Sequence, residues 1–251
     1  MRTLLLSALL AAVPFGQGTP LSTPRNAGIV YATQAPTESF TDYLYLYFTG
    51  ERIPNGEQVY GALSNNNSPK SWTTLNSGQP ILASHLGMKG IRDPSLIISP
   101  DRSKFFLIAT DLKVYGLGWG NGTCFTCPET GSKQLIPWTS TDLVNWTGPV
   151  ARTVSPPEAG MTWAPDAIWD PARNKYMVFW TSKLQGNLII LRCWTEDFET
   201  FAKTEVFGEF GMDLTIAEDK GKFYMISKRQ VAFMDRRLHA RRRRIPGVRD
   251  Q

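Results

Sequence analysis

Short apolar runs, each bounded by turn-forming residues, recur along most of the chain. The clearest runs are rich in aromatic and aliphatic side chains and span residues 43–48, 105–109, 175–180, 188–191 and 222–226. Gly, Pro, Asn or Asp bounds each of them, as is typical of β-strands. No apolar spacing predicts an amphipathic helix longer than about two turns. The pattern therefore predicts an all-β protein.

The predicted strands form a repeating unit. Each of three successive units begins near an Asp and continues through a hairpin; the three residues are Asp93, Asp166 and Asp213. The first two units end in similar segments, at 138–146 and 193–201. Repeated β-hairpin units are the signature of a β-propeller, whose innermost strands line a central channel. An Asp at the head of each unit would therefore place several carboxylates around one mouth of that channel.

The net charge is confined to one end of the chain. The 251 residues carry 27 basic and 22 acidic side chains, a formal charge of +5. Residues 235–251 alone hold seven Arg and two Asp, so the other 234 residues carry 20 of each sign and are neutral. A neutral body gives no electrostatic reason to expect nucleic acid as a partner.

The two ends of the chain differ from the repeats. Residues 1–18 resemble an export signal, with Arg2 before an apolar run that is too short to span a bilayer. No other stretch is long and apolar enough for a membrane span, so we expect a secreted protein without a membrane partner; a buried N-terminal segment is the alternative. Residues 229–251, with Arg241–Arg244, predict a disordered, solvated tail outside the propeller, or else a localisation or heparin-binding patch.

The three cysteines favour a disulfide over a metal site. Cys124 and Cys127 are three residues apart, whereas Cys193 is distant from both. A zinc site would need a second pair or nearby histidines, and His85 and His239 are the only histidines. We expect a Cys124–Cys127 disulfide and a buried Cys193 thiol.

Four segments, in chain order, resemble glycoside hydrolase family 43 over residues 40 to 228. They are Gly-Ile-Arg-Asp-Pro-Ser at 90–95, Ser-Thr-Asp-Leu-Val-Asn-Trp at 140–146, Thr-Trp-Ala-Pro-Asp at 162–166 and Met-Asp-Leu-Thr at 212–215. The resemblance implies a five-bladed propeller with arabinofuranosidase, endo-arabinanase or xylosidase activity. It implies arabinose- or xylose-containing plant cell-wall polysaccharides or oligosaccharides as substrates. It implies no cofactor and no catalytic metal, although some relatives hold a structural calcium.

The resemblance also implies an inverting mechanism and a set of site residues. One carboxylate activates water while a second carboxylic acid protonates the leaving oxygen. Asp93 resembles the general base and Asp213 the aspartate that tunes the acid's pKa. The expected substrate-binding residues are Trp163, Asp166, Arg92 and His85. Each Asp is alternatively a turn residue at a strand start, and Trp163 and His85 are alternatively structural.

The family's general acid is missing from the expected place. That acid is a Glu in a Glu-Gly-Pro or Glu-Ala-Pro segment, and no such segment follows Asp213; Glu218 falls in a hairpin turn. We therefore expect an incomplete propeller at 19–228, truncated after its third blade, with strands 43–76 belonging to the closing blade. The alternatives to an enzyme are a non-catalytic carbohydrate-binding remnant and an unstable truncated gene product.

Overall fold

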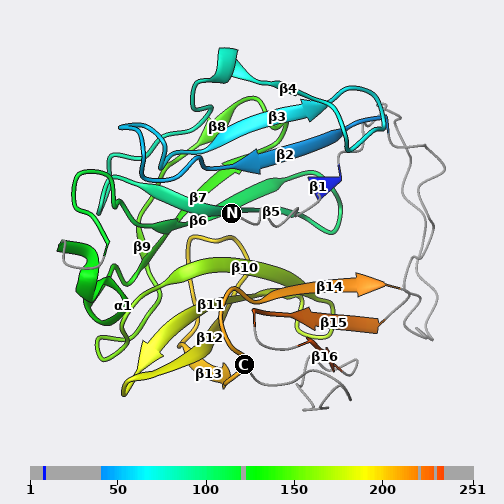
Figure 1. Ribbon diagram of the computed structural model, residues 1–251. Helices are drawn as coiled ribbons and strands as arrows, with labels where there is room; N and C mark the ends of the chain where they lie inside the picture. Colours follow the sequence, from blue (N-terminus) through cyan, green and yellow to red (C-terminus); the bar gives the residue numbers. More distant parts are fainter. Residues whose placement is uncertain (1–7, 10–40, 120–122, 220–221, 229–230, 235–251) are drawn as a thin grey trace, which may run out of the picture.

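The computed structural model describes residues 8–9, 41–119, 123–219, 222–228 and 231–234 (Figure 1). Antiparallel strands dominate this part of the chain, which confirms the all-β prediction. The helical segments among the described residues span only three or four residues each: η1 Asn76–Gly78, η2 Thr123–Thr126 and α1 Cys127–Thr130. No helix in these described ranges has the length and apolar character needed to cross a membrane.

The first sheet has the strand order β1-β2-β3-β4. Its strands are β1 Ala8–Leu9, β2 Tyr43–Tyr47, β3 Tyr60–Ser64 and β4 Trp72–Thr74. β1 lies in the segment predicted to be an export signal and pairs with Tyr43 and Leu44. The remainder of residues 1–40 lies outside the described residues, so the signal stays a prediction.

Two larger sheets follow along the chain. The second contains β5 Ile91–Ile98, β6 Phe105–Asp111, β7 Gln134–Ser140 and β8 Trp146–Thr147 in that order, and β9 Arg152–Thr153 also pairs with β7. The third contains β10 Trp163–Asp170, β11 Lys175–Leu184, β12 Asn187–Thr195 and β13 Glu205–Gly208. Each is a meander of consecutive strands, as expected of a propeller blade.

The fourth sheet extends further than the sequence predicts. It contains β14 Thr215–Asp219, β15 Lys222–Ile226 and β16 Val231–Met234. β16 pairs antiparallel with β15 and lies in 229–251, the segment that we expected to fall outside the propeller. The apolar run of β16 is short, and the arginine-rich residues that follow it dominate the sequence pattern of this segment. The predicted disordered tail from 235 onward lies outside the described residues.

One strand of each sheet contacts a strand of the next sheet, and in the last three sheets it is the innermost strand. β2 contacts β5, β5 contacts β10, and β10 contacts β14. Figure 1 shows the four sheets following one another around a common centre, with these strands on the inner side. The described residues thus form a propeller-type fold that supplies four sheets, so a five-bladed ring is incomplete in this part of the chain.

Both faces of the two central sheets are buried between their neighbours. Along β11, Val178 and Trp180 pack against the second sheet, whereas Met177 and Phe179 pack against the fourth. β6 alternates in the same way between the third sheet and the first. Because successive residues of a strand point to opposite faces, burial of both faces requires the continuous apolar runs seen in the sequence.

The cysteine predictions are confirmed. A disulfide joins Cys124 to Cys127, and Cys193 is a buried free thiol on β12. The bridged segment packs against Leu112 and Val114 in a small cluster beside the second sheet. The segment between β6 and β7 is therefore anchored by a disulfide and by apolar packing.

Removal of the Trp180 indole tests the packing between the second and third sheets. Trp180 is fully buried between the second and third sheets, and its indole N–H donates to Ser155 Oγ at 2.8 Å. We expect Trp180→Ala to lower the free energy of unfolding by about 3–5 kcal/mol in urea denaturation. Val144→Ala, at a side chain that is 79% exposed, should cost less than about 0.5 kcal/mol. Equal losses in the two variants would contradict the blade-to-blade core.

Candidate functional site

The innermost strands begin with the same backbone irregularity. The ladder between β5 and β6 breaks between Arg92 and Ser95, and the ladder between β10 and β11 breaks between Trp163 and Asp166. Within each break lies one residue with left-handed backbone: Asp93 at φ 49° and Ala164 at φ 48°. Asp213, just before β14, has φ 53°. The three blades therefore present the same local bend at the inner end of the fold.

The position of this bend shows which residues of the three repeat units are equivalent. Asp93, Ala164 and Asp213 occupy equivalent positions, so the second blade has an alanine where its neighbours have an acid. Asp166 lies two residues further on, at the position equivalent to Ser95 and Thr215. The sequence-based expectation that each unit begins with an equivalent Asp is thus wrong for the second unit.

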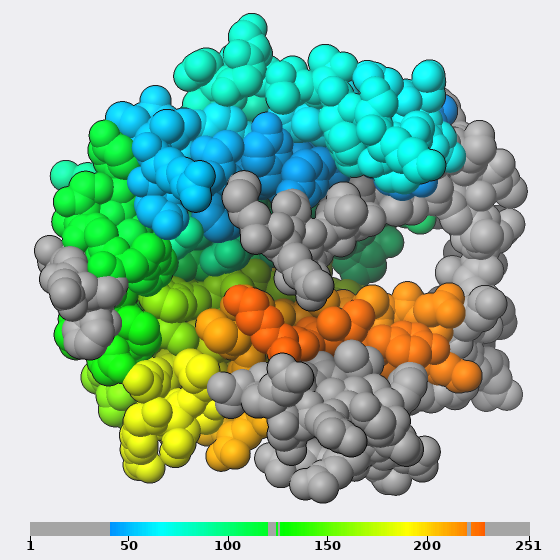
Figure 2. Space-filling model, in the orientation of Figure 1, coloured from blue at the N-terminus to red at the C-terminus, as the bar shows by residue number. Residues whose placement is uncertain are grey.

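The three aspartates nevertheless meet in one cleft. The cleft has a volume of about 530 Å³ and is lined from all four sheets, by residues that include Tyr45, Tyr47, Asp93, Asp166, Asp213 and Lys228. In Figure 2 the blue and cyan atoms of the first sheet face the orange atoms of the last sheet across an open hollow. The prediction that several carboxylates share one mouth is confirmed for these residues.

The environment of Asp93 favours its protonated form. Thr110 Oγ1 donates a hydrogen bond to Asp93 Oδ2 at 3.2 Å. Burial, followed by the negative charge of Asp213, raises the pKa of Asp93 to about 6. Arg92, the Thr110 hydrogen bond and Lys228 oppose this shift without cancelling it. A carboxylate with this pKa accepts a proton more readily than an ordinary aspartate and is still ionised at neutral pH.

Asp213 is held from two directions. Its backbone N–H donates to Thr181 Oγ1 at 2.9 Å, from β11 of the preceding blade. Its carboxylate forms an ion pair with the Nζ of Lys228, which follows β15. In the same way, Thr110 accepts the backbone N–H of Ala164 at 2.8 Å. A threonine of the preceding blade thus fixes the bends at Ala164 and Asp213.

Asp166 is half-buried, and its carboxylate is occupied by hydrogen bonds from the protein. Ser95 Oγ and the backbone N–H of Ala167 donate to its Oδ1 at 2.7 and 2.8 Å, and Thr215 Oγ1 donates to its Oδ2 at 2.8 Å. Burial raises the pKa of this carboxyl, and the three hydrogen bonds oppose the rise. Asp166 therefore lines the cleft while it binds the blades on both sides of its own.

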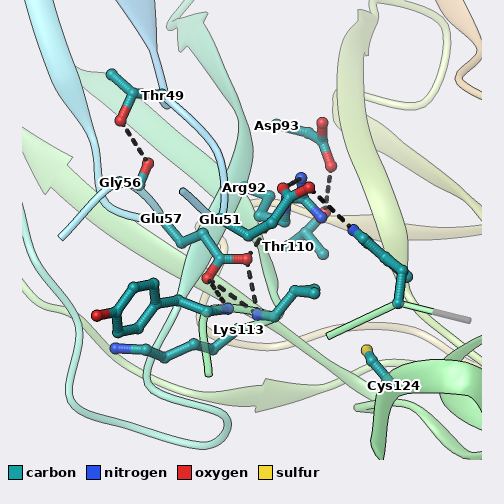
Figure 3. Close-up of polar contacts among 12 residues, drawn as sticks. Thr49, Glu51, Gly56, Glu57, Arg92, Asp93, Thr110, Lys113 and Cys124 are labelled. Carbon is teal, nitrogen blue, oxygen red and sulfur yellow. Dashed lines mark hydrogen bonds and ion pairs between the residues drawn. The ribbon is translucent and has the colours of Figure 1, made fainter. Parts of the chain in front are cut away.

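Arg92 is fixed beside the cleft in a cluster of charged and aromatic groups. Figure 3 shows its guanidinium near Glu51 and Glu57, with Asp93 next to it. Arg92 Nη2 donates to Glu51 Oε2 at 3.0 Å, and its Nε lies 3.9 Å from buried Glu57. Phe48, which lines the cleft, lies 4.8 Å from the guanidinium carbon. This pairing keeps a positive charge near Asp93.

Trp163 and His85 lie outside the residues that line the cleft. Trp163 is partly buried, packs against the cluster of the disulfide segment, and has a buried Nε1 without a hydrogen-bond partner among the described residues. Trp119 packs edge-on against it, with ring centroids 6.1 Å apart. His85 is exposed in the loop before β5. Their predicted roles in substrate binding stay predictions.

Sequence reasoning missed several residues of this site. Ser95 could have been found by aligning Pro94 with Pro165, which places it at the position of Asp166. Thr215 follows Leu214 and lacks this proline marker. Lys228 and Trp119 carry no such signal, because only the folded chain brings them to Asp213 and Arg92.

No group of three His, Cys, Asp or Glu side chains suited to a metal ion occurs within the described ranges. The carboxylates of the cleft are instead taken up by hydroxyl, ammonium and backbone donors. The expectation of no cofactor, with a structural calcium in some relatives, stays a prediction.

Comparisons with known proteins agree with this geometry. Residues 38–240 match the model of a glycosyl hydrolase 43-related family, described as a probable glycosyl hydrolase domain. An α-L-arabinofuranosidase of Bifidobacterium longum is 31% identical over 212 residues, which are 74% of this chain and 19% of the relative. The chain thus spans about a fifth of that curated relative.

Solved structures share the fold at low identity. A family 117 glycoside hydrolase of Zobellia galactanivorans has a TM-score of 0.58 at 12% identity, covering 80% of this chain and 65% of its own. An exo-β-1,3-galactanase of Phanerochaete chrysosporium has a TM-score of 0.51 at 10% identity, covering 77% and 44%. With the family match over most of its length, the chain belongs to the glycosyl hydrolase 43-related family.

Proposed function

We propose that this chain carries the cleft of a secreted glycoside hydrolase that acts on arabinose- or xylose-containing oligosaccharides of plant cell walls. The observation that carries the proposal is the meeting of Asp93 and Asp213 in one cleft, where burial and their mutual repulsion raise the pKa of Asp93. Membership of the glycosyl hydrolase 43-related family and the similarity to an α-L-arabinofuranosidase support this choice of chemistry.

In the proposed reaction, Asp93 acts as the general base. Its carboxylate takes a proton from a water molecule, and that water attacks the anomeric carbon from the face opposite the departing sugar oxygen. The bond to the departing oxygen breaks with its electron pair, and the configuration at the anomeric carbon inverts. Asp213, paired with Lys228, sets the charge around Asp93.

Protonation of the departing oxygen is the step without an assigned group. The glutamate position expected from the resemblance is not found after Asp213 in this sequence. A second candidate function, sugar binding without turnover, is therefore favoured by this one observation. Export is supported by the N-terminal pattern and by the Cys124–Cys127 disulfide, since disulfides persist in oxidising compartments.

Substitution of Asp93 separates hydrolysis from binding. Asparagine tolerates left-handed backbone as aspartate does, so Asp93→Asn should fold. We expect kcat on an aryl α-L-arabinofuranoside to fall on the order of 10²–10⁴-fold because the base is lost. Asp219→Asn, at an exposed residue at the far end of β14, should leave kcat unchanged. Turnover by Asp93→Asn equal to that of the unmodified chain would exclude Asp93 as the base.

Dependence on the leaving group tests the missing acid. A nitrophenolate departs without protonation, whereas a sugar alkoxide needs a proton. We therefore expect 4-nitrophenyl α-L-arabinofuranoside to be hydrolysed at least about 100-fold faster than an arabino-oligosaccharide, because proton assistance is typically worth 10²–10⁴-fold. Equal rates on the two substrates would show that an acid is in place.

The pH profile follows from the environment of Asp93. The base must be ionised, so kcat/KM should rise with pH through about 6 and then level off. Asp213→Asn removes the neighbouring negative charge that favours protonated Asp93, so the rise should move to lower pH. A profile with the same midpoint in both proteins would contradict the coupling of the two carboxyls.

A further inference from the structure

Ser95, Asp166 and Thr215 are equivalent residues of three successive blades, and they meet. Each lies two residues after the left-handed residue that begins its innermost strand. Ser95 donates to one oxygen of Asp166 and Thr215 donates to the other. The Asp166 carboxylate is thus hydrogen-bonded to the equivalent residue of each neighbouring blade.

These hydrogen bonds hold the backbone close to Asp93 and Asp213, the two residues proposed for the chemistry. Asp93 lies two residues before Ser95, and Asp213 lies two residues before Thr215. The break between Arg92 and Ser95 leaves Asp93 and Pro94 without partners in the β5–β6 ladder. Because ladder hydrogen bonds do not fix this segment, side-chain contacts must do so.

The same contacts argue against a direct role for Asp166 in binding sugar. Its Oδ1 already accepts two hydrogen bonds, from the Ser95 hydroxyl and from the backbone N–H of Ala167. Its Oδ2 accepts the Thr215 hydroxyl. Three of the four lone-pair sites of the carboxylate are therefore taken up within the protein.

We propose that Asp166 is a positioning residue, which sets the relative placement of the Asp93 and Asp213 carboxylates by holding Ser95 and Thr215. The proposal rests on the proposed function, because it assigns Asp166 a part in that reaction. A displacement of about 1 Å in a reacting group costs on the order of 100-fold in rate. Ser95 lies two residues from Asp93, and Thr215 lies two residues from Asp213. Holding Ser95 and Thr215 therefore limits displacements of this size in the two carboxylates.

A matched pair of substitutions at Thr215 tests the tether without changing charge. Thr215→Val removes the hydroxyl and keeps the shape, whereas Thr215→Ser keeps the hydroxyl. With 4-nitrophenyl α-L-arabinofuranoside, Thr215→Val should lower kcat on the order of 10–100-fold while KM changes less than about threefold. Thr215→Ser should retain the kcat of the unmodified chain. Equal kcat for the two variants would overturn the proposal.

Substitution of the carboxylate itself has a control on the same strand. Asp170 is a buried aspartate at the other end of β10, where its carboxylate accepts the backbone N–H of Ala172 and pairs with Arg173 of the adjacent turn. Asp166→Asn should lower kcat as Thr215→Val does, whereas Asp170→Asn should affect only the free energy of unfolding. A loss of kcat of the same size in both variants would show a general structural role and contradict the proposal.

A readout without substrate distinguishes failure of this proposal from failure of the proposed function. If the unmodified full chain hydrolyses no aryl glycoside, the proposed function fails and an NMR titration of the Asp93 carboxyl carbon decides the tether alone. Release of Thr215 should let Asp213 move away and water enter, so the pKa of Asp93 should fall from about 6 toward 3.8 in Thr215→Val. An unchanged Asp93 pKa in Thr215→Val would overturn the positioning role.

Discussion

The left-handed bend at the inner end of three blades is the constraint on which the site depends; it interrupts the hydrogen-bond ladders of β5 and β10 and directly precedes β14. Left-handed backbone is sterically unfavourable for residues other than glycine, and such strain costs of the order of 1–3 kcal/mol per residue. The fold maintains it at Asp93, Ala164 and Asp213. In two of the three blades, the residue held in this way is an acid that faces the cleft.

Side-chain hydrogen bonds between blades replace the missing ladder contacts. Thr110 accepts the N–H of Ala164, and Thr181 accepts the N–H of Asp213, so two of the three bends are held by the blade before them. Asp166 adds a contact in both directions. The well-packed layers between the blades make these contacts effective, because a rigid core transmits the position of one blade to the next.

The sequence predicts the strands well and the site only in part. Strand positions follow from apolar runs that burial on both faces requires, as along β11. The equivalence of Asp166 with Ser95 and Thr215 depends on a two-residue offset that the repeat of aspartates hides. The ion pair of Lys228 with Asp213 and the enclosure of Arg92 by Phe48 and Trp119 join distant segments, and no local pattern encodes such contacts.

The proposed function requires that a sugar bind in the cleft that contains Asp93 and Asp213. The most direct measurement is a crystal structure of the full chain carrying Asp93→Asn, soaked with an arabino-oligosaccharide. We expect a pentose ring within hydrogen-bond distance of residue 93 and of Asp213, inside the cleft that Tyr45 and Tyr47 also line. Sugar bound only at another surface, with this cleft filled by water, would contradict it.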